Sequence, residues 1–255
     1  MPTMQDSTTS AGDPDHPAYT FETFVVSEGS KAAWTAAVAA AERPGHGHNP
    51  LFLHGPTGSG KSHLLHAISQ HMQSHAPRAN IQRLAADTYV KRIAEAIRRD
   101  RLVTFRQEAT ALGALLLDDI RLAGQPHAAE EIFRQIGGLT AAGVQVVLTA
   151  DASPTGAMHE RLQRTNAAII ELAYPDRAAR AEILRRAANT RGVALAETVI
   201  EMLADRGPRS PSGLHSLISR IAAESLISSR ALPESTILEL AAIGHSQIGS
   251  HHSRR

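Results

Sequence analysis

One eight-residue segment restricts the fold of this chain more than any other. Residues 55–62 read GPTGSGKS and fit the pattern GxxxxGK(S/T). A short apolar run at residues 51–54 precedes the segment, and helical periodicity over residues 62–75 follows it. In this context glycines let backbone N–H groups surround a phosphate at the positive end of the following helix. The segment therefore predicts a nucleotide site where a buried strand meets a helix.

Each residue of this phosphate loop has an expected role. Lys61 is expected to pair with the β- and γ-phosphates, and the Ser62 hydroxyl is expected to ligate Mg²⁺. The predicted nucleotide contacts in the loop are Gly55, Pro56, Thr57, Gly58, Ser59, Gly60, Lys61 and Ser62.

Polar residues also follow two predicted buried strands. The segment LLLDDI contains Asp118 and Asp119, and VVLTAD contains Thr149 and Asp151. Ligands bind at the carboxyl edge of parallel strands, so we expect these residues beside the phosphate loop. Asp118 is expected to hold Mg²⁺ through water, and Asp119 to orient the attacking water. Thr149 or Asp151 is expected to sense the γ-phosphate, the alternative being a polar turn that only ends the strand.

The hydrophobic pattern divides the chain near Pro175. Before it, strands alternate with helices, which predicts an α/β fold with a mostly parallel sheet. The expected strands are 51–54, 113–120, 143–149 and 167–172, and the expected helices are 31–42, 62–75 and one around 90–97. After it we expect only helices, at 177–190, 196–205, 212–228 and 234–242. The predicted domains are a disordered tail (1–18), a nucleotide-binding core (19–175), a helical domain (176–243) and a flexible tail (244–255).

Composition excludes several classes of protein. The net charge of the 255 residues is +1, so any nucleic-acid contact must be a local patch rather than a general polycationic surface. Cysteine is absent, which excludes disulfide frameworks and thiolate metal sites and fits a reducing compartment. No apolar run is long enough for a membrane span, and the polar start does not resemble a signal peptide. We therefore expect a cytoplasmic protein.

Taken in order, the motifs resemble those of the AAA+ ATPases, and among them the ATPase domains of DnaA-type bacterial replication initiators. HNPLFLHGPTGSGKSHLLHAI is similar to the initiator phosphate loop and its helix, LLLDDI and VVLTAD to the Walker B and sensor 1 strands, and YTFETFVV to the N-terminal nucleotide box. The resemblance covers most of the chain, residues 19–242. It implies a five-stranded parallel sheet with flanking helices, a small all-α lid after it, and ATP or ADP with Mg²⁺ as ligands.

The resemblance also assigns roles to residues outside these motifs. Tyr19 and Phe24 of the nucleotide box are expected to pack on the adenine, and His63, which directly follows the loop, is a further expected nucleotide contact. Arg161 or Arg164 is expected to act as an arginine finger on the nucleotide of a neighbouring subunit. For Arg164 the alternative is an ordinary surface arginine.

The sequence departs from the family pattern in three places. Ser212 stands where the family has a lid arginine, with Arg209 nearby as a candidate substitute. Arg164 stands one place forward of the family's finger position. No helix-turn-helix domain follows the lid, so we expect no sequence-specific binding of duplex DNA by that route.

A basic segment corresponds to the part of the initiators that grips single-stranded DNA. It lies within residues 87–106, and a weak, sequence-independent contact with single-stranded DNA is the interpretation we test against an ordinary solvated helix face. The basic residues expected to make the contact are Lys91, Arg92, Arg98, Arg99 and Arg101, with Arg106 on the same polar face.

The leading hypothesis is an ATP-binding, slowly hydrolysing DnaA-type AAA+ protein in replication initiation or its regulation. Its expected partner is a related AAA+ ATPase such as the initiator itself, or another copy of the chain. Two alternatives stay open: a helicase or transposase loader of the DnaC and IstB kind, and an adaptor that nucleotide stabilises without turnover.

Overall fold

The computed structural model describes residues 19–121, 126–228, 233 and 236–241. The expected tails at 1–18 and 244–255 lie outside the described residues, as do parts of the expected helix at 234–242. The chain forms two compact units. We call residues 1–24, 32–55 and 61–171 the sheet unit, and residues 25–31, 56–60 and 172–255 the helical unit.

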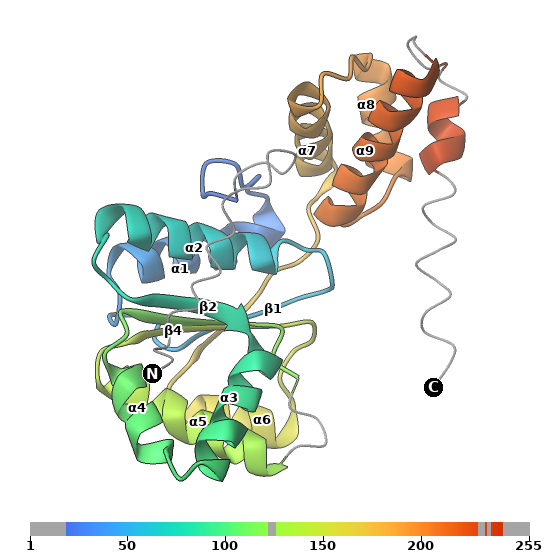
Figure 1. The fold of residues 1–255 in the computed structure, drawn as a ribbon. Helices are drawn as coiled ribbons and strands as arrows, with labels where there is room; N and C mark the ends of the chain where they lie inside the picture. Colours follow the sequence, from blue (N-terminus) through green and yellow to red (C-terminus); the bar gives the residue numbers. More distant parts are fainter. Residues whose placement is uncertain (1–18, 122–125, 229–232, 234–235, 242–255) are drawn as a thin grey trace. The chain divides into compact units, whose positions relative to one another are not determined.

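The sheet unit contains a five-stranded parallel sheet (Figure 1). Its strands lie in the order β2-β3-β4-β1-β5, so β4 is central. The parallel sheet with flanking helices confirms the predicted fold class. The strands are β1 (Leu51–His54), β2 (Ile81–Ala85), β3 (Ala114–Asp118), β4 (Gln145–Ala150) and β5 (Ala168–Glu171).

Helices cover both faces of the sheet (Figure 1). Most of α1 and all of α2 lie on one face, and α3 to α6 lie on the other. Their bounds are α1 (Glu28–Glu42), α2 (Lys61–His75), α3 (Ala86–Arg98), α4 (Leu102–Thr110), α5 (Pro126–Ala141) and α6 (Gly156–Arg164).

The core is built by side chains of the central strands that point alternately to the two faces of the sheet. Leu115 and Leu117 on β3 pack in one cluster with Ile132 and Ile136 of α5. Leu116 on the same strand is fully buried as well, and because side chains alternate along a strand it points to the opposite face. Burial on both faces explains why β3 and β4 read as continuous apolar runs in the sequence.

Four elements of the sheet unit were missed by the sequence pattern: β2, α4, α5 and α6. Strand β2 has the sequence IQRLA, and none of its residues is fully buried because it lies at the edge of the sheet. An edge strand needs no apolar run, so its signal is weak. The strands expected at 51–54, 113–120, 143–149 and 167–172 correspond to β1, β3, β4 and β5.

Asn49 fastens the start of β1 to the start of β4. Its Nδ2 donates to the Val144 carbonyl at 2.9 Å, and its Oδ1 accepts from the Val146 N–H at 2.8 Å. Buried Gln145 adds a second link by donating from Nε2 to the His48 carbonyl at 2.9 Å. These bonds set the approach of β1, and with it the position from which the phosphate loop departs.

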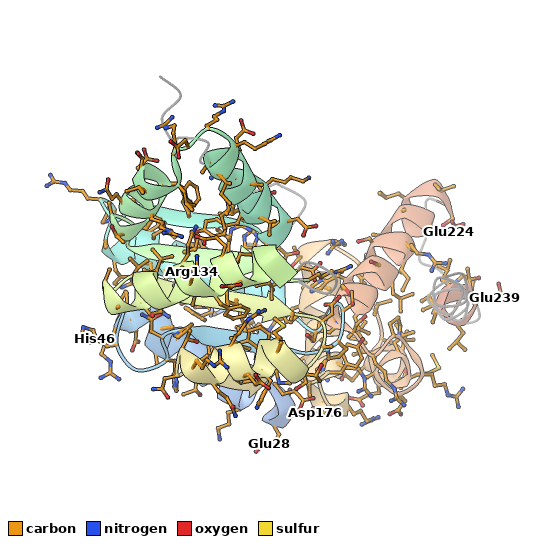
Figure 2. The ribbon with its side chains drawn as sticks, turned by 90° about the horizontal axis from the view of Figure 1, so that it is seen from below. Glu28, His46, Arg134, Asp176, Glu224 and Glu239 are labelled. Atoms are coloured by element: carbon orange, nitrogen blue, oxygen red, sulfur yellow. The ribbon has the colours of Figure 1, made fainter. Side chains whose placement is uncertain are left out.

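The helical unit has a core of its own. It contains α7 (Arg177–Thr190), α8 (Glu197–Arg206), α9 (Pro211–Ser228) and a helical segment at 236–241. Leu184, Leu203 and Leu217 belong to its apolar cluster. Asp176 begins α7 by accepting the Ala179 N–H at 2.9 Å, as a helix-capping carboxylate does (Figure 2). The all-helical pattern expected beyond Pro175 is therefore present in the described residues.

Within the part of the chain that the structure describes, no helix combines the length and the apolar character that crossing a membrane requires.

We predict that Asn49→Ala lowers the free energy of unfolding of the sheet unit by about 1–3 kcal/mol, because the Val144 carbonyl just before β4 and the Val146 N–H in β4 lose their partner. Trp34 on α1 is the only tryptophan, so its fluorescence during urea unfolding reports on this unit. Gln107→Ala, at an exposed position of α4, is the control and should change the unfolding midpoint little. Equal midpoints for Asn49→Ala and the wild type would contradict the role given to Asn49.

Candidate nucleotide site

The phosphate loop connects β1 to α2 through an irregular turn. The Gly55 N–H donates to the Ala150 carbonyl at 3.2 Å, which ties the start of the loop to the end of β4. Gly58 and Gly60 have φ angles of 77° and 112°, in a region that side chains disfavour. The glycines thus stand where the turn needs positive φ angles, as the sequence pattern predicts. Helix α2 begins within the loop segment, at Lys61.

Lys61 is a buried cation at the N-terminus of a helix. Its residue exposure is 6%. Its Nζ donates to the Gly55 carbonyl at 2.7 Å and pairs with Asp151 Oδ1 at 2.9 Å. The N-terminus of a helix disfavours positive charge, and burial of a charge is costly without a partner. This position is therefore suited to an anion.

Thr149 holds the two aspartates at the end of β3. Its fully buried hydroxyl donates to Asp118 Oδ1 at 2.5 Å and accepts the Asp119 N–H at 2.8 Å. The Ile120 N–H donates to the Thr149 carbonyl at 2.7 Å. A hydroxyl has one proton, and here it is committed to Asp118. The structure therefore gives Thr149 a positioning contact, and the sensing of a γ-phosphate by Thr149 or Asp151 stays a prediction.

Asp151 lies between two cations. Its Oδ1 pairs with Lys61, and its Oδ2 lies 3.4 Å from a terminal nitrogen of Arg121. Arg121 also binds Asp119, through Nε to Oδ1 at 2.9 Å and through its terminal nitrogen to Oδ2 at 2.8 Å. Sequence reasoning missed Arg121, and its position two residues after the aspartate pair was the only signal.

The residues expected to receive the adenine gather around one histidine. The Tyr19 ring lies 4.9 Å from the His63 ring, and the Phe24 ring meets His63 edge-on at 5.1 Å. His63 Nε2 is 2.8 Å from the Thr20 carbonyl, which ties the N-terminal segment to α2. The structure therefore brings Tyr19, Phe24 and His63 together.

Within the helical unit, Ser212 lies against Gly58 of the loop. The Ser212 N–H donates to the Gly58 carbonyl at 3.5 Å, and a Cβ added at Gly58 would collide with Ser212 Oγ. Thr57 is held in the same unit, where its carbonyl accepts the Tyr174 hydroxyl at 3.1 Å. The short side chain of Ser212 thus allows position 212 to lie close to Gly58. The long arginine side chain of the family pattern would occupy this space differently.

Arg161 and Arg164 lie in the last turn of α6. The Arg164 side chain is 77% exposed, and its guanidinium is 3.8 Å from the Glu160 carboxylate. An exposed pair at this distance holds an arginine weakly, so Arg164 is accessible to another molecule.

The expected DNA-binding arginines carry carboxylate partners of their own. Arg98 and Arg99 both pair with Glu95, and Arg101 lies 3.9 Å from Glu108. Lys91 is exposed and Arg92 is half-buried on the same helix, α3.

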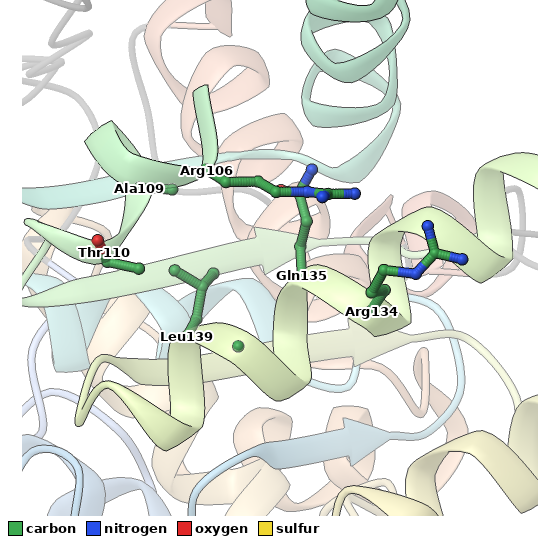
Figure 3. Close-up of a pocket in the computed structure, with 7 residues that line it drawn as sticks. Arg106, Ala109, Thr110, Arg134, Gln135 and Leu139 are labelled. Atoms are coloured by element: carbon green, nitrogen blue, oxygen red, sulfur yellow. The ribbon is translucent and has the colours of Figure 1, made fainter. Parts of the chain in front are cut away.

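Arg106 differs from these residues, because it faces α5. It donates three hydrogen bonds to Glu131, at 2.6, 2.8 and 3.2 Å, and lines a hollow of about 130 Å³ with Arg134 and Gln135 (Figure 3). Burial favours the neutral form of Glu131, but hydrogen bonds from Arg106 and Gln135 outweigh it and lower the pKa of this carboxyl. Arg106 thus stabilises the packing of α4 on α5.

The residues present fit a nucleotide with a divalent cation. The Ser59 hydroxyl is buried and has no hydrogen-bond partner among the described residues, so it is free for a ligand oxygen. Ser62 is exposed in the first turn of α2 and Asp118 is half-buried, and both supply the oxygen ligands that Mg²⁺ prefers. Among the described residues, no three His, Cys, Asp or Glu side chains form a metal site by themselves.

A family model and sequence relatives both identify the same family. The family model of the bacterial DnaA ATPase domain matches residues 16–169. The chromosomal replication initiator protein DnaA of Thermus thermophilus is 35% identical over 194 residues, which cover 74% of this chain and 44% of that protein. That of Roseiflexus castenholzii is 33% identical over 213 residues, with 82% of this chain and 44% of that protein covered.

Solved structures agree with these sequence matches. Domain III of the Thermotoga maritima replication initiation protein DnaA superposes with a TM-score of 0.79 at 26% identity, covering 88% of this chain and 96% of that one. A replication initiator DnaA bound to AMPPCP and single-stranded DNA gives 0.72 at 26% identity, with 81% and 65% covered. The chain spans less than half the length of the two sequence relatives. By the match of its sequence and of its sheet, the chain belongs to the family of bacterial DnaA ATPase domains.

Proposed function

We propose that this chain binds ATP and hydrolyses it slowly, and that it acts in the cytoplasm in the initiation of DNA replication or its control. The observation that carries the proposal is the buried Lys61 ammonium at the start of α2, which binds the Asp151 carboxylate and the Gly55 carbonyl. Relatives named as replication initiators support the biological setting, and a neighbour bound to AMPPCP supports the ligand.

The proposed site assigns each residue one task. The loop from Gly55 to Ser62 binds the phosphates, with Lys61 exchanging Asp151 for phosphate oxygens. Tyr19, Phe24 and His63 receive the adenine. Ser62 and Asp118 hold Mg²⁺, which neutralises phosphate charge when it is bound.

Hydrolysis requires a positioned water. The water oxygen forms a bond to the γ-phosphorus while the bond to the bridging oxygen of the β-phosphate breaks, which yields ADP and inorganic phosphate. Asp119 orients that water from the end of β3, and Thr149 fixes the backbone from which Asp119 projects. Asp151 remains at the same strand edge as a partner of cations rather than of the phosphate.

A neighbouring ATPase completes the proposed mechanism. Arg164, exposed at the end of α6, or Arg161 one turn earlier, reaches the γ-phosphate of a related ATPase such as the initiator, or of a second copy of this chain. An isolated chain then hydrolyses ATP poorly. The helical unit serves as the lid, with Ser212 against the loop where an arginine would otherwise read the nucleotide.

Single-stranded DNA is the second proposed partner. A neighbour of this chain is bound to single-stranded DNA, and exposed basic residues lie on α3 at Lys91 and Arg98 and directly after it at Arg99. Because Glu95 pairs with both arginines, binding is weak and competes with these internal pairs.

We predict that ATP and ADP raise the melting temperature of the wild type by several degrees and that Lys61→Ala removes the shift. A ligand at about 100 times its Kd stabilises the native state by about 2.7 kcal/mol. Lys31→Ala removes an exposed lysine from α1 and serves as the control. A wild type without any nucleotide-dependent shift in Mg²⁺ would show that the site does not bind nucleotide.

Asp119→Asn is expected to retain ATP binding while turnover falls about 100-fold or more, the scale of a well-placed acid–base group. Asp119 has a φ of 58°, a conformation that asparagine also adopts readily, so the backbone should persist. Asp100→Asn is the matched control, since Asp100 is exposed with a φ of 53°. If binding and turnover fell together in Asp119→Asn, Asp119 would be a metal ligand or a structural residue.

For DNA, the double variant Arg98→Ala with Arg99→Ala should weaken binding of single-stranded oligonucleotides and leave nucleotide binding unchanged. The slope of log K against log salt should decrease in magnitude by about 1.4, at about 0.7 per lost phosphate contact. The matched control removes two exposed, carboxylate-paired arginines of α7, Arg177 and Arg186. An unchanged salt slope would exclude α3 as the contact.

A further inference from the structure

Arg121 binds the carboxylate that is proposed to orient the water. Its Nε donates to Asp119 Oδ1 at 2.9 Å and its terminal nitrogen pairs with Oδ2 at 2.8 Å, so both carboxylate oxygens are engaged. These hydrogen bonds, and then the charge of Asp119, raise the pKa of the Arg121 guanidinium above its usual value. No motif accounts for this contact.

The backbone of Asp119, the partner of Arg121, is held in one conformation. Asp119 has a φ of 58°, and its N–H is fixed on the Thr149 hydroxyl at 2.8 Å. Arg121 follows two residues later and turns back on Asp119. The planar guanidinium matches the carboxylate with two parallel bonds, which a lysine ammonium cannot do.

Arg121 also belongs to a row of alternating charges at the strand edge. Lys61 pairs with Asp151 Oδ1 at 2.9 Å, and Asp151 Oδ2 lies 3.4 Å from Arg121, which in turn holds Asp119. When Lys61 turns to a phosphate, Asp151 loses one of these cations and keeps Arg121. Arg121 is then the cation of this row that Asp119 and Asp151 share.

We propose that Arg121 is a positioning residue that restrains hydrolysis by holding Asp119 away from the attacking water. The inference rests on the proposed ATPase function, and it adds a second reason, beside the missing arginine of a neighbour, for the slow hydrolysis proposed for an isolated chain. A carboxylate with both oxygens bonded to a guanidinium offers less to a water proton than an unpaired carboxylate does. Removal of the guanidinium frees Asp119 without replacing any residue of the loop that binds the phosphates.

The test compares Arg121→Gln with the wild type in steady-state hydrolysis and in equilibrium binding. We expect kcat to rise about three- to tenfold, a fraction of the effect of a fully positioned base. The KM for ATP should stay within about twofold, as should the ratio of Kd values for ADP and a non-hydrolysable ATP analogue. Arg121→Lys, which keeps the charge without the fork, should give an intermediate kcat.

Two further variants serve as controls. Arg134→Gln removes an arginine of α5 that also binds two carboxylates, Glu130 and Glu131, and it should leave kcat unchanged (Figure 2). Asp119→Asn combined with Arg121→Gln should lose the gain, because the freed carboxylate is then absent.

The outcomes separate this inference from the proposed function. A lower kcat in Arg121→Gln, or weaker binding of the ATP analogue alone, would overturn the restraint and make Arg121 a γ-phosphate contact. Normal nucleotide binding with unchanged kcat would overturn the restraint and leave the ATPase proposal standing. A wild type that binds no nucleotide would overturn both.

Discussion

A lysine ammonium buried at the N-terminus of α2 is the interaction on which the rest of the site depends. Lys61 is 6% exposed, and the end of the helix that it begins repels positive charge. Its carbonyl and carboxylate partners, Gly55 and Asp151, come from the ends of β1 and β4. A buried cation requires anions, so this corner of the sheet unit is built for negative charge and a triphosphate supplies more of it than one aspartate does.

The positions of the residues around Lys61 are determined by the register of the strands. In β1, Leu53 pairs with Thr149 of β4, so the loop leaves the sheet beside the residue that organises the two aspartates. Thr149 is fully buried on the central strand. Its hydroxyl binds Asp118 at the C-terminal end of β3, and its carbonyl accepts the N–H of Ile120 just beyond that end. Strand register consequently fixes where charge lies at this edge, and fixed charge is the condition for electrostatic stabilisation of a transition state.

The sequence was informative where the signal is local and silent where it is tertiary. The loop motif and the apolar runs of β1, β3, β4 and β5 could be located, whereas β2 has a partly polar edge-strand sequence. The motifs named Asp118, Asp119 and Thr149 but gave no indication that the threonine hydroxyl bridges the aspartates. That contact, like the return of Arg121 onto Asp119, depends on register and on one positive φ angle, which no spacing reveals. Arg106 was expected on a DNA-binding face, and its contact with Glu131 follows from the packing of α4 on α5.

The exchange of partners at Lys61 can be observed directly, because the chain has only three lysines, Lys31, Lys61 and Lys91. Their side-chain ammonium signals in nitrogen-15 NMR can be assigned by replacing each lysine in turn. We predict that Asp151→Asn shifts the Lys61 signal without nucleotide, that a non-hydrolysable ATP analogue with Mg²⁺ also shifts it, and that with the analogue bound Asp151→Asn has no further effect. A Lys61 signal that ignores saturating nucleotide, or that depends equally on Asp151 with and without it, would contradict the account.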